Sequence, residues 1–489
     1  MLVQSRCAVL MVWILVCGIA LTSCRLQPDV SEIVESSDPV NLVYYTIGNP
    51  DTDLKLVNDA LNKLLKNKIN VTISYNKIPW DDYESYVMSL VNAGQPFDIA
   101  FAVNYATNAL RKAWLSLNDY LTTVGKPMYD AIHPTFWEGV KIDGQIYGVP
   151  TNKELAVLAQ WMFPREIIEK YNIDLSQYDS LESLESLFAM IKKKEPDYLV
   201  MELDKQSHNF FVFYGYEYIT ERSLPLVVKS LSDKPVIENV FETSDGRHVL
   251  DILRRYYLEG YINSDASTYH SASLEKGKKV FFKQADGGPY SDTIWSQQRG
   301  YDLVTKTIIE EPIVTTEAVR GGIMCVSANT SYPEECVKFL NCLNTDAEVR
   351  NMINFGIEGI HYTLDKNDQV IKAENERYAG VQYTQGNWFL LKTLGGSVPE
   401  PRDKWLEYQK FNDSARRSNI LGFTPDLRDY LTVLQRIEQA YNKYYPSLMT
   451  GSVDVDTFLP KFIQELENAG LNEVKAELQR QLNEWLENK

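Results

Sequence analysis

The stretch NLVYYTIGNPDTDLKLVNDALNKLLKNKINVTISYNKI, residues 41–78, sets the architecture expected for this chain. It opens with a β-rich run that ends in a Gly-Asn-Pro turn at residues 48–50. Apolar residues then recur at spacings of three and four over residues 54–64, which is the period of an amphipathic helix. Over residues 71–75 they alternate, as in a half-buried strand. The stretch therefore predicts a strand, a helix and a second strand.

The residues that follow continue this alternation of strand and helix. WDDYESYVMSLVNAG, residues 80–94, has the helical period, and FDIAFAV, residues 97–103, is a third β-rich run. Strands that alternate with helices pair in parallel through right-handed crossovers, so the sequence predicts an α/β fold. In parallel sheets, ligands bind beyond the carboxyl ends of the strands. Those ends are followed here by Asn49, Trp80 and Asn104, which are candidate ligand-binding residues.

The middle of the chain mixes short strands with helices, whereas the C-terminal third is mostly helical. A hairpin turn is expected at residues 143–144, a chain crossing at Pro150, and helices over residues 164–171 and 182–194. In the last segment one apolar stripe recurs at helical spacing, formed by Leu471, Val474, Leu478, Leu482 and Trp485. The charged residues beside this stripe leave it facing a partner surface.

Residues 1–23 have the features of a secretory signal. A basic residue, Arg6, precedes an uncharged apolar run that ends in small residues. The tetrapeptide Leu-Thr-Ser-Cys at residues 21–24 resembles the lipobox of bacterial lipoproteins, which implies cleavage before Cys24 and attachment of lipid to its sulfur. Residues 24–40 are polar and acidic, and they predict a flexible tether. An uncleaved membrane anchor is the alternative.

The composition is that of a globular chain with an excess of acidic residues. At 489 residues the chain is long enough for two or more domains. Its 49 basic and 66 acidic residues leave a formal net charge of -17. Affinity for nucleic acid comes from clustered Lys and Arg, so this balance argues against a nucleic-acid partner. After the signal, no segment is long and apolar enough to span a bilayer.

Motifs of catalysis and metal binding are absent from the sequence. It contains no GxSxG elbow, no phosphate-binding loop, no HExxH pair and no dinucleotide fingerprint. None of the five histidines has a second histidine at ligand spacing: His133, His208, His248, His270 and His361. Apart from Cys24, three cysteines follow the signal; they match no disulfide or zinc pattern and are expected to be buried free thiols: Cys325, Cys336 and Cys342. The sequence thus predicts no cofactor, no metal and no enzymatic activity.

Aromatic residues are abundant, with 30 Tyr, 9 Trp and 18 Phe making up 12% of the chain. Sugars present flat C–H faces that stack on such rings, while their hydroxyls need a few well-placed polar groups. Most of the rings are expected to lie in the core. Trp80, Trp161 and Trp388 each stand beside polar residues near a strand or loop edge, so they are the best candidates for contact with a sugar.

The order of several motifs resembles the extracellular solute-binding proteins of bacterial ABC importers, in the family-one (maltose-binding-like) clan. FWEGVKIDGQIYGVPTNKE, residues 136–154, is similar to the run that marks the first crossing between lobes. Residues 321–364 are similar to the strand and helix that return to the N-lobe. Residues 421–485 resemble the extra C-terminal domain of the lipoprotein, oligosaccharide-type branch. One departure lies in residues 275–295, where Tyr290 stands at a position often taken by tryptophan.

The resemblance implies a two-lobe, clamshell α/β fold with a largely helical C-terminal extension. The lobes are joined by a hinge, and a ligand is held between them. On this resemblance the N-lobe is expected over residues 41–149 and 310–350, and the first part of the C-lobe over residues 150–309. Residues 351–489 are expected to complete the C-lobe and to form the helical C-terminal domain.

The resemblance also implies where ligand-binding residues lie. Asn49, Trp80 and Asn104 are expected on the rim of the N-lobe. Thr151 and Asn152 are expected at the hinge, facing the cleft. The C-lobe is expected to contribute Trp161, Gly288, Tyr290 and Trp388. Glu358 has two interpretations: it reaches the cleft, or it accepts hydrogen bonds from backbone N–H groups.

These observations predict a lipid-anchored subunit of an ABC importer on the extracellular face of the plasma membrane. Its partners would be a carbohydrate, in particular an oligosaccharide, the membrane permease, and the outer leaflet through the lipid on Cys24. A surface glycosidase is an alternative, because the separation of two carboxylates is set by the fold and not by the sequence. A receptor that presents its ligand to a sensor kinase is another alternative, since it needs the same two lobes.

Overall fold

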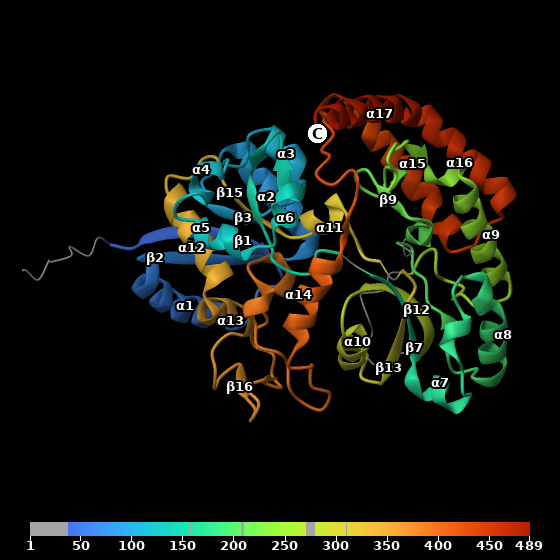
Figure 1. Ribbon diagram of the computed structural model, residues 1–489, viewed down its shortest axis with the longest axis horizontal. Coiled ribbons are helices and arrows are strands. Elements are labelled where there is room, and N and C mark those ends of the chain that lie inside the picture. The colour runs from blue at the N-terminus through green and yellow to red at the C-terminus, as the bar shows by residue number, and fades with distance from the viewer. Residues whose placement is uncertain (1–37, 157, 207–209, 270–278, 310) are drawn as a thin grey trace, which may run out of the picture. The chain divides into compact units, whose positions relative to one another are not determined.

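The computed structural model describes residues 38–156, 158–206, 210–269, 279–309 and 311–489 (Figure 1). The predicted signal peptide, Cys24 and most of the predicted tether lie outside the described residues, as do His208 and His270. The described residues form two large hydrophobic cores, each around one main β-sheet. The N-lobe is the core around the five-stranded sheet, and the C-lobe is the core around the four-stranded sheet. None of the described helices is long and apolar enough to cross a membrane.

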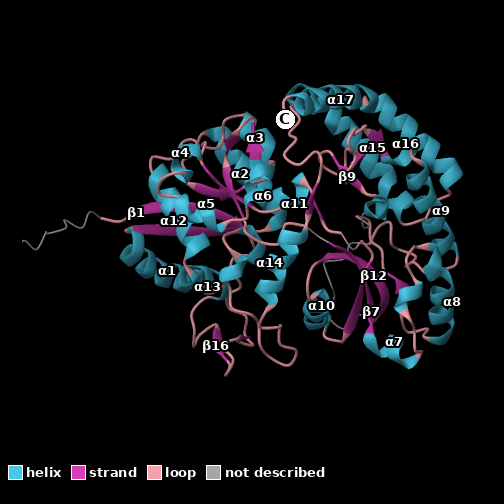
Figure 2. Ribbon diagram, in the orientation of Figure 1, coloured by secondary structure: helices cyan, strands magenta, loops and turns pink. Residues whose placement is uncertain are grey.

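The N-lobe sheet has the strand order β2-β1-β3-β15-β6. β1 pairs in parallel with β2 and β3, whereas β15 is antiparallel to β3 and β6. The five strands are β1 (Val40–Ile47), β2 (Val71–Ile78), β3 (Ile99–Phe101), β6 (Gly148–Pro150) and β15 (Ile323–Val326). Helices connect the three parallel strands (Figure 2), so the α/β arrangement predicted for residues 41–103 is confirmed.

The N-lobe helices pack by their apolar faces. Leu61 and Leu65 of α1 and Val87 of α2 are buried in the N-lobe core. The helices with residues in this core are α1 (Leu54–Ile69), α2 (Trp80–Ala93), α3 (Tyr105–Leu110), α4 (Asn118–Leu121), α5 (Lys126–Ala131), α6 (Pro134–Val140), α11 (Thr316–Arg320), α12 (Pro333–Thr345) and α13 (Ala347–Phe355). The predicted hairpin turn joins β4 (Lys141–Ile142) to β5 (Gln145–Ile146), with both turn residues at positive φ.

The C-lobe sheet has the strand order β13-β7-β12-β8. β7 is antiparallel to both β12 and β13, whereas β12 is parallel to β8. The strands are β7 (Leu158–Pro164), β8 (Leu199–Met201), β12 (Val280–Gly287) and β13 (Leu303–Thr307). A second, antiparallel sheet consists of β9 (Tyr216–Tyr218), β10 (Leu226–Lys229) and β11 (Glu238–Asn239).

Two helices of the C-lobe match the boundaries expected from the sequence. The helix predicted over residues 164–171 is α7 (Arg165–Lys170). The one predicted over residues 182–194 is a 3-10 turn, η2 (Glu182–Leu184), that continues as α8 (Glu185–Lys194). The other helices before residue 300 are α9 (Ser244–Leu258) and α10 (Ser291–Arg299). The remaining 3-10 helices of the described chain are η1 (Leu175–Gln177), η3 (Phe210–Tyr214), η4 (Val240–Glu242), η5 (Gln382–Thr384), η6 (Trp388–Leu390) and η7 (Arg428–Tyr430).

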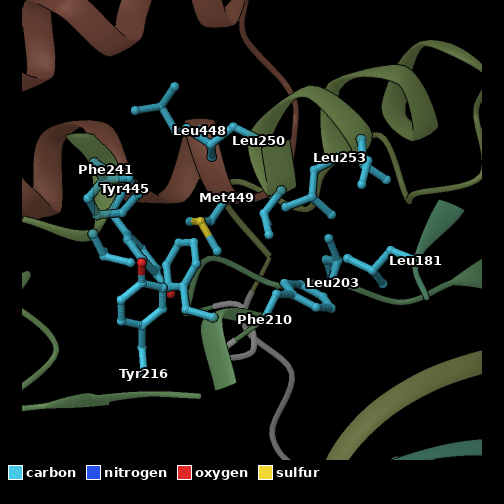
Figure 3. Close-up of a cluster of buried hydrophobic side chains, with 14 of the residues drawn as sticks. Leu181, Leu203, Phe210, Tyr216, Phe241, Leu250, Leu253, Tyr445, Leu448 and Met449 are labelled. Carbon is cyan, nitrogen blue, oxygen red and sulfur yellow. The ribbon is translucent and has the colours of Figure 1, made fainter. Parts of the chain in front are cut away.

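The last three helices belong to the core of the C-lobe. They are α15 (Leu431–Met449), α16 (Val455–Ala469) and α17 (Leu471–Glu487). Figure 3 shows Tyr445, Leu448 and Met449 of α15 in one cluster with Leu250 and Leu253 of α9. Because these side chains share one apolar interior, the C-terminal helices and the C-lobe stabilise one another.

The apolar stripe of α17 is buried against the same core. Leu471, Val474, Leu478 and Leu482 are all at most 1% exposed. Trp485 packs edge-on against Phe423, with ring centroids 5.7 Å apart. The partner surface that the stripe was expected to face is therefore part of the same chain.

The N-lobe core continues beyond residue 350, the boundary expected from the sequence. Ile353 of α13 and Leu421 are both buried in it. The hairpin of β16 (Tyr362–Leu364) and β17 (Val370–Lys372) follows α13, next to a small core of Phe355, Tyr362, Val370 and Leu391. The chain then forms α14 (Lys404–Ser414) and β18 (Arg416–Arg417), which pairs with β14 (Ile313–Val314).

The segment between β6 and β7, which we call the hinge, carries the chain from the N-lobe sheet to the C-lobe sheet. It follows Pro150, where the sequence predicts a crossing. Asn412, near the end of α14, holds this segment from the side. Its amide nitrogen donates to the carbonyl of Lys153, and its amide oxygen accepts from the N–H of Leu155, both at 2.8 Å. Two segments far apart in sequence are thus joined at the hinge.

The three described cysteines are buried free thiols, as predicted. Burial raises the pKa of Cys336 to about 12 and that of Cys342 to about 11. Both groups therefore stay protonated at neutral pH, and a protonated thiol is a poor nucleophile and a poor metal ligand.

Candidate ligand-binding site

Trp80 lies on the surface at the carboxyl edge of the N-lobe sheet. It is the first residue of α2, shortly after the end of β2, and its side chain is 60% exposed. One face of its ring is stacked on Tyr383, with centroids 6.1 Å apart and planes 10° apart. Phe101, at the end of β3, packs edge-on against the same tyrosine. Trp80 is thus an exposed ring held on an aromatic platform.

The start of α2 places this ring at the strand end. Pro79 has an extended ψ of 151°, and the helix begins at the next residue. Asp81 and Asp82 in the first turn favour a helix N-terminus here, because carboxylates are stabilised by the helix dipole. Tyr83 turns into the core, whereas Trp80 and Glu84, one helical turn apart, both remain exposed.

The two asparagines predicted on this rim are exposed. Asn104 caps the start of α3 in the left-handed conformation, with φ 48°, and its amide donates to the carboxylate of Glu84. Asn49 follows Gly48 in the turn after β1. The three candidates at the strand ends, which include Trp80, thus lie at solvent-accessible positions after β1, β2 and β3.

Thr151 and Asn152 are buried at the hinge, at 1% and 2% exposure. The N–H of Thr151 donates to the carbonyl of Gly322, and that of Asn152 donates to the carbonyl of Gly386. The Thr151 hydroxyl and the Asn152 amide oxygen have no hydrogen-bond partner among the described residues. In this structure the two residues hold crossing segments together and are not open to solvent.

Trp161 lies inside the C-lobe core, contrary to the expectation that it contacts a sugar. It sits in β7, between β12 and β13, and is 0% exposed. Its ring packs against Phe213 and Phe282, and its indole N–H donates to Gln284 at 3.4 Å. A ring without exposed surface has no face to offer a ligand.

Gly288 and Tyr290 form the turn between β12 and α10. Tyr290 has φ 61°, an uncommon conformation for a residue with a side chain. The Ser291 hydroxyl accepts from the N–H of Gly288 at 2.8 Å, which fixes the turn. The Tyr290 hydroxyl donates to Asp403 at 3.1 Å. Tyr290 is partly exposed, so part of its side chain remains accessible.

Trp388 and Glu358 lie near the hairpin of β16 and β17 and near α13, respectively. Trp388 packs on the small core beside β16 and β17, and its ring centroid lies 6.2 Å from that of Trp405. Its indole N–H donates to the carbonyl of Gln382. Glu358 borders a pocket of about 760 Å³ beside α13. Within the described chain its carboxylate accepts no hydrogen bond from a backbone N–H. A larger pocket is lined by Glu84, one helical turn after Trp80 on α2, but not by Trp80, Trp388 or Glu358.

The larger pocket has a volume of about 800 Å³ and takes residues from both lobes. The N-lobe side is formed by α2, α3 and α11, including Glu84, Asn104 and Glu317. The C-lobe side is formed by residues within 218–224 and 423–438. Among the described residues no group of three or more His, Cys, Asp or Glu side chains is placed to hold a metal ion.

Arg222, Asp286 and Glu317 interact electrostatically beside this pocket. Glu317 lines it, and Arg222 stands between two lining residues, Glu221 and Ser223. Asp286 and Glu317 are solvent-exposed, yet desolvation by the surrounding protein raises the pKa of each carboxyl. Exposure combined with desolvation is expected of groups on a concave surface. Desolvation lowers the pKa of Arg222, but the nearby charges, Glu317 foremost, outweigh it, so the net shift is upward.

The Arg222 side chain has no hydrogen bond or ion pair within the described chain. Its guanidinium group therefore keeps all five donors for water or a ligand. Nothing in the sequence singles out Arg222, Glu317 or Tyr383, because each is a single residue of a common type with no motif around it. Asp286 could have been identified from the sequence, since it immediately precedes the Gly-Gly-Pro-Tyr run at residues 287–290.

Two family models match the chain. Residues 59–360 match the model described as bacterial extracellular solute-binding protein. Residues 419–487 match a domain of unknown function (DUF3502). The second match begins before α15 and ends with α17, so it coincides with the helices that complete the C-lobe core.

Known proteins are similar over nearly the whole chain. A carbohydrate ABC transporter substrate-binding protein of Streptococcus pneumoniae is 27% identical over 485 residues, or 96% of each chain. The crystal structure of the N-glycan transport solute binding protein NgtS from Streptococcus pneumoniae is 25% identical, with a TM-score of 0.83 over 92% of this chain and 99% of that one. The complex of NgtS with Man5GlcNAc has a TM-score of 0.75, at 25% identity over 92% of this chain and 99% of that one. The complex with Man1GlcNAc has a TM-score of 0.77, at 25% identity over 91% and 99%.

These matches agree with the two cores and with the pocket that both lobes line. The first model covers more than half of the chain, from α1 through the return to the N-lobe at α12 and α13. The predicted two-lobe α/β fold is confirmed, and so is the interpretation of the chain as a binding protein and not an enzyme. The chain belongs to the family of bacterial extracellular solute-binding proteins.

Proposed function

We propose that this protein binds an oligosaccharide between its two lobes and delivers it to the permease of an ABC importer. The observation that carries this proposal is the exposed ring of Trp80, which is stacked on Tyr383. It lies one helical turn before Glu84, which lines the pocket of about 800 Å³ together with other polar and apolar side chains. A flat aromatic face next to convergent polar groups suits a sugar, which has both a C–H face and a ring of hydroxyls. The stated functions of the relatives, carbohydrate and N-glycan transport, support the same ligand class.

Each part of the site has a role in this proposal. The free face of Trp80 stacks on one sugar ring, while Tyr383 keeps the indole in place from behind. Arg222 donates hydrogen bonds to sugar hydroxyls, and the carboxylates of Asp286 and Glu317 accept from them. The pocket takes residues from both lobes, so closure of the lobes around the ligand would remove these groups from water.

We also propose that the mature protein is attached to the outer face of the plasma membrane through lipid on Cys24. The tetrapeptide at residues 21–24 and membership of an extracellular family support this anchor. Two acyl chains give stable attachment, whereas one chain gives only marginal binding. Replacement Cys24→Ala is expected to abolish labelling with a fatty-acid analogue. Labelling that persists in Cys24→Ala would contradict the anchor.

Thermal unfolding in the presence of a panel of glycans tests the binding function. The panel contains Man1GlcNAc, Man5GlcNAc, maltose-series oligosaccharides and free monosaccharides. A ligand at about 100 times its Kd stabilises the folded state by about 2.7 kcal/mol, which is a clear upward shift of Tm. A shift with at least one oligosaccharide, and none with a panel of amino acids and peptides, is the expected result. A shift with peptides alone would overturn the carbohydrate assignment.

A further inference from the structure

We propose that the C-terminal module, residues 419–487, forms one wall of the ligand cleft and binds the sugar units beyond the one stacked on Trp80. This inference rests on the proposed function, and it gives a role to the segment that matches a domain of unknown function. The ligand class is a neutral oligosaccharide of more than two units.

The first observation is that α15 has two distinct faces. Its buried face, with Tyr441, Tyr445 and Leu448, belongs to the C-lobe core, and Ile437 lies at the border, buried in the core and lining the pocket. Its other face lines the pocket with side chains at the spacing i, i+3, i+4 and i+7, namely Leu431, Leu434, Gln435 and Glu438. Residues at this spacing lie on one side of a helix. The helix therefore joins the core on one side and borders the pocket on the other.

The second observation is that the exposed face of α15 has the composition of a sugar contact. Leu431 is 41% exposed, so the apolar part of this face is open to solvent. The side chains of Gln435 and Glu438 are exposed, and they have no hydrogen-bond or ion-pair partner within the described residues. An apolar patch beside a free amide and a free carboxylate suits the C–H face and the hydroxyls of a sugar.

The third observation is that the loop before α15 is fastened to the N-lobe. The Arg320 guanidinium of α11 donates to the Thr424 hydroxyl at 2.7 Å. The Arg428 guanidinium donates to the carbonyl of Leu110, at the end of α3, at 3.2 Å. The module is thus held both by the C-lobe core and by N-lobe contacts at the pocket, which positions its exposed face as a wall.

The fourth observation is that the pocket runs from the neighbourhood of Trp80 to α15. Glu84 lies one helical turn after Trp80 on α2, and it lines the same pocket as Glu438. Desolvation raises the pKa of Glu221, and the charges of Glu438 and Glu84 raise it further. These three carboxyls, from α2, the loop after β9 and α15, are therefore close enough to interact. The pocket therefore connects α2, the helix that begins with Trp80, to α15.

The charge of the lining favours neutral sugars. The pocket has five acidic side chains and three arginines: Glu84, Glu221, Glu317, Asp426, Glu438, Arg111, Arg320 and Arg428. Two of the arginines, Arg320 and Arg428, already donate to protein oxygens. Carboxylates accept hydrogen bonds from hydroxyl groups and repel anionic sugars.

Binding of a short and a long glycan to α15 variants tests the inference. The probes are Man1GlcNAc and Man5GlcNAc, titrated by calorimetry into the full chain and its variants. Gln435→Ala and Glu438→Ala are each expected to weaken Man5GlcNAc about 5- to 10-fold, the effect of one lost hydrogen bond, and to change Man1GlcNAc less than about twofold. The matched control is Gln439→Ala, an exposed residue of the same helix outside the pocket lining, which is expected to change neither affinity.

Two results would overturn the inference while the proposed function stands. One is an unchanged Man5GlcNAc affinity in both variants, and the other is an equal loss for the two glycans. Trp80→Ala serves as the separate check on the proposed function, because it is expected to weaken both glycans. If Trp80→Ala changes neither affinity, or if the wild-type chain binds neither glycan, the proposed site fails and the inference fails with it. An unchanged Tm of the ligand-free variants establishes that they fold.

Discussion

Trp80 and Trp161 stand in similar local sequences, each at the edge of a predicted strand and beside polar residues, yet they lie in opposite environments. Trp80 is 60% exposed and Trp161 is 0% exposed. Trp80 comes shortly after the end of β2, where the chain has already left the sheet. Trp161 is the central residue of β7, which has a neighbouring strand on each side. Position relative to the end of the strand, and not local polarity, separates the exposed ring from the core ring.

The same contrast holds for the carboxyl groups. Asp286 and Glu317 are desolvated but still exposed. Glu217, in β9, is 6% exposed and accepts a hydrogen bond from the Ser418 hydroxyl. Burial raises the pKa of Glu217 to about 8; the bond from Ser418 opposes this rise, and the charge of Glu317 adds to it. Asp286 and Glu317 are therefore accessible to a ligand, whereas Glu217 is part of the interior.

The largest expected effect is on the buried side of the comparison. Trp161→Ala removes a ring packed against Phe213 and Phe282, and it is expected to lower the free energy of unfolding by about 3–5 kcal/mol. Urea denaturation followed by circular dichroism measures this loss, and Trp161→Phe, which retains an aromatic ring, is the milder control. A loss below about 1 kcal/mol would mean that Trp161 is not a core residue, and it would contradict the contrast between Trp161 and Trp80.

The second effect concerns pH. The folded-state pKa of Glu217, about 8, lies above its ordinary value of 4.5, so the folded chain binds this proton more tightly than the unfolded chain. The stabilisation is complete below pH 4.5 and is lost as the pH rises towards 8. We expect the free energy of unfolding to fall by about 2 kcal/mol between about pH 5 and pH 7 because of this group.

Glu217→Gln is the variant that isolates this contribution, because an amide does not titrate. Urea denaturation at several pH values is expected to show a smaller decline for the variant than for the wild-type chain. Glu169→Gln makes the same replacement at an exposed position of α7 and serves as the control, with a decline close to that of the wild type. Identical pH profiles for Glu217→Gln and the wild type would contradict the burial of Glu217.

The third effect is on the exposed side. Trp80→Ala is expected to weaken the best oligosaccharide of the panel by about 2 kcal/mol, or roughly 30-fold, while changing the stability of the ligand-free protein by less than about 0.5 kcal/mol. Tyr332→Ala replaces another exposed aromatic residue and should leave the affinity unchanged. A loss of several kcal/mol in ligand-free stability would instead place Trp80 with Trp161 among the core residues.

The smallest effect sharpens the role of the platform beneath Trp80. Tyr383→Leu keeps an apolar side chain but removes the stacked ring, whose interaction with Trp80 is worth about 1 kcal/mol. We expect a correspondingly small loss of glycan affinity, because the indole is then less well oriented. Calorimetry on Trp80→Ala, Tyr383→Leu and the double variant measures the coupling between the two rings. Fully additive losses would mean that Tyr383 does not position Trp80.

The elements of the fold were largely predictable because their signals are local. The apolar periods over residues 41–103 correspond to β1, α1, β2, α2 and β3, with small differences at the ends. The hairpin turn at residues 143–144 followed from a short pattern, and the buried thiols followed from the lack of any disulfide or zinc spacing. The surface that covers the apolar stripe of α17 could not be predicted in this way, because the period of one helix identifies an apolar face but not the surface it packs against.

The candidate site was predictable only in part. The rule for strand ends identified Trp80, because the end of a strand can be read from consecutive residues. The search for tryptophans beside polar residues also selected Trp161. That search considers neighbours in sequence, and it does not consider the strands that flank β7 in the sheet. Tyr383 and Arg222 were missed, since each gains its place at the site only through contact or charge interaction with a distant segment.

Residue order alone was sufficient for the α/β alternation, the apolar face of each helix and the strand end that bears Trp80. Packing of the chain decided which tryptophan is exposed, which carboxyls lie close enough to Arg222 to affect its pKa, and that α15 contributes to both the C-lobe core and the pocket. The physical reason is that periodicity is a property of neighbouring residues, whereas burial and charge separation depend on which surfaces exclude water from one another.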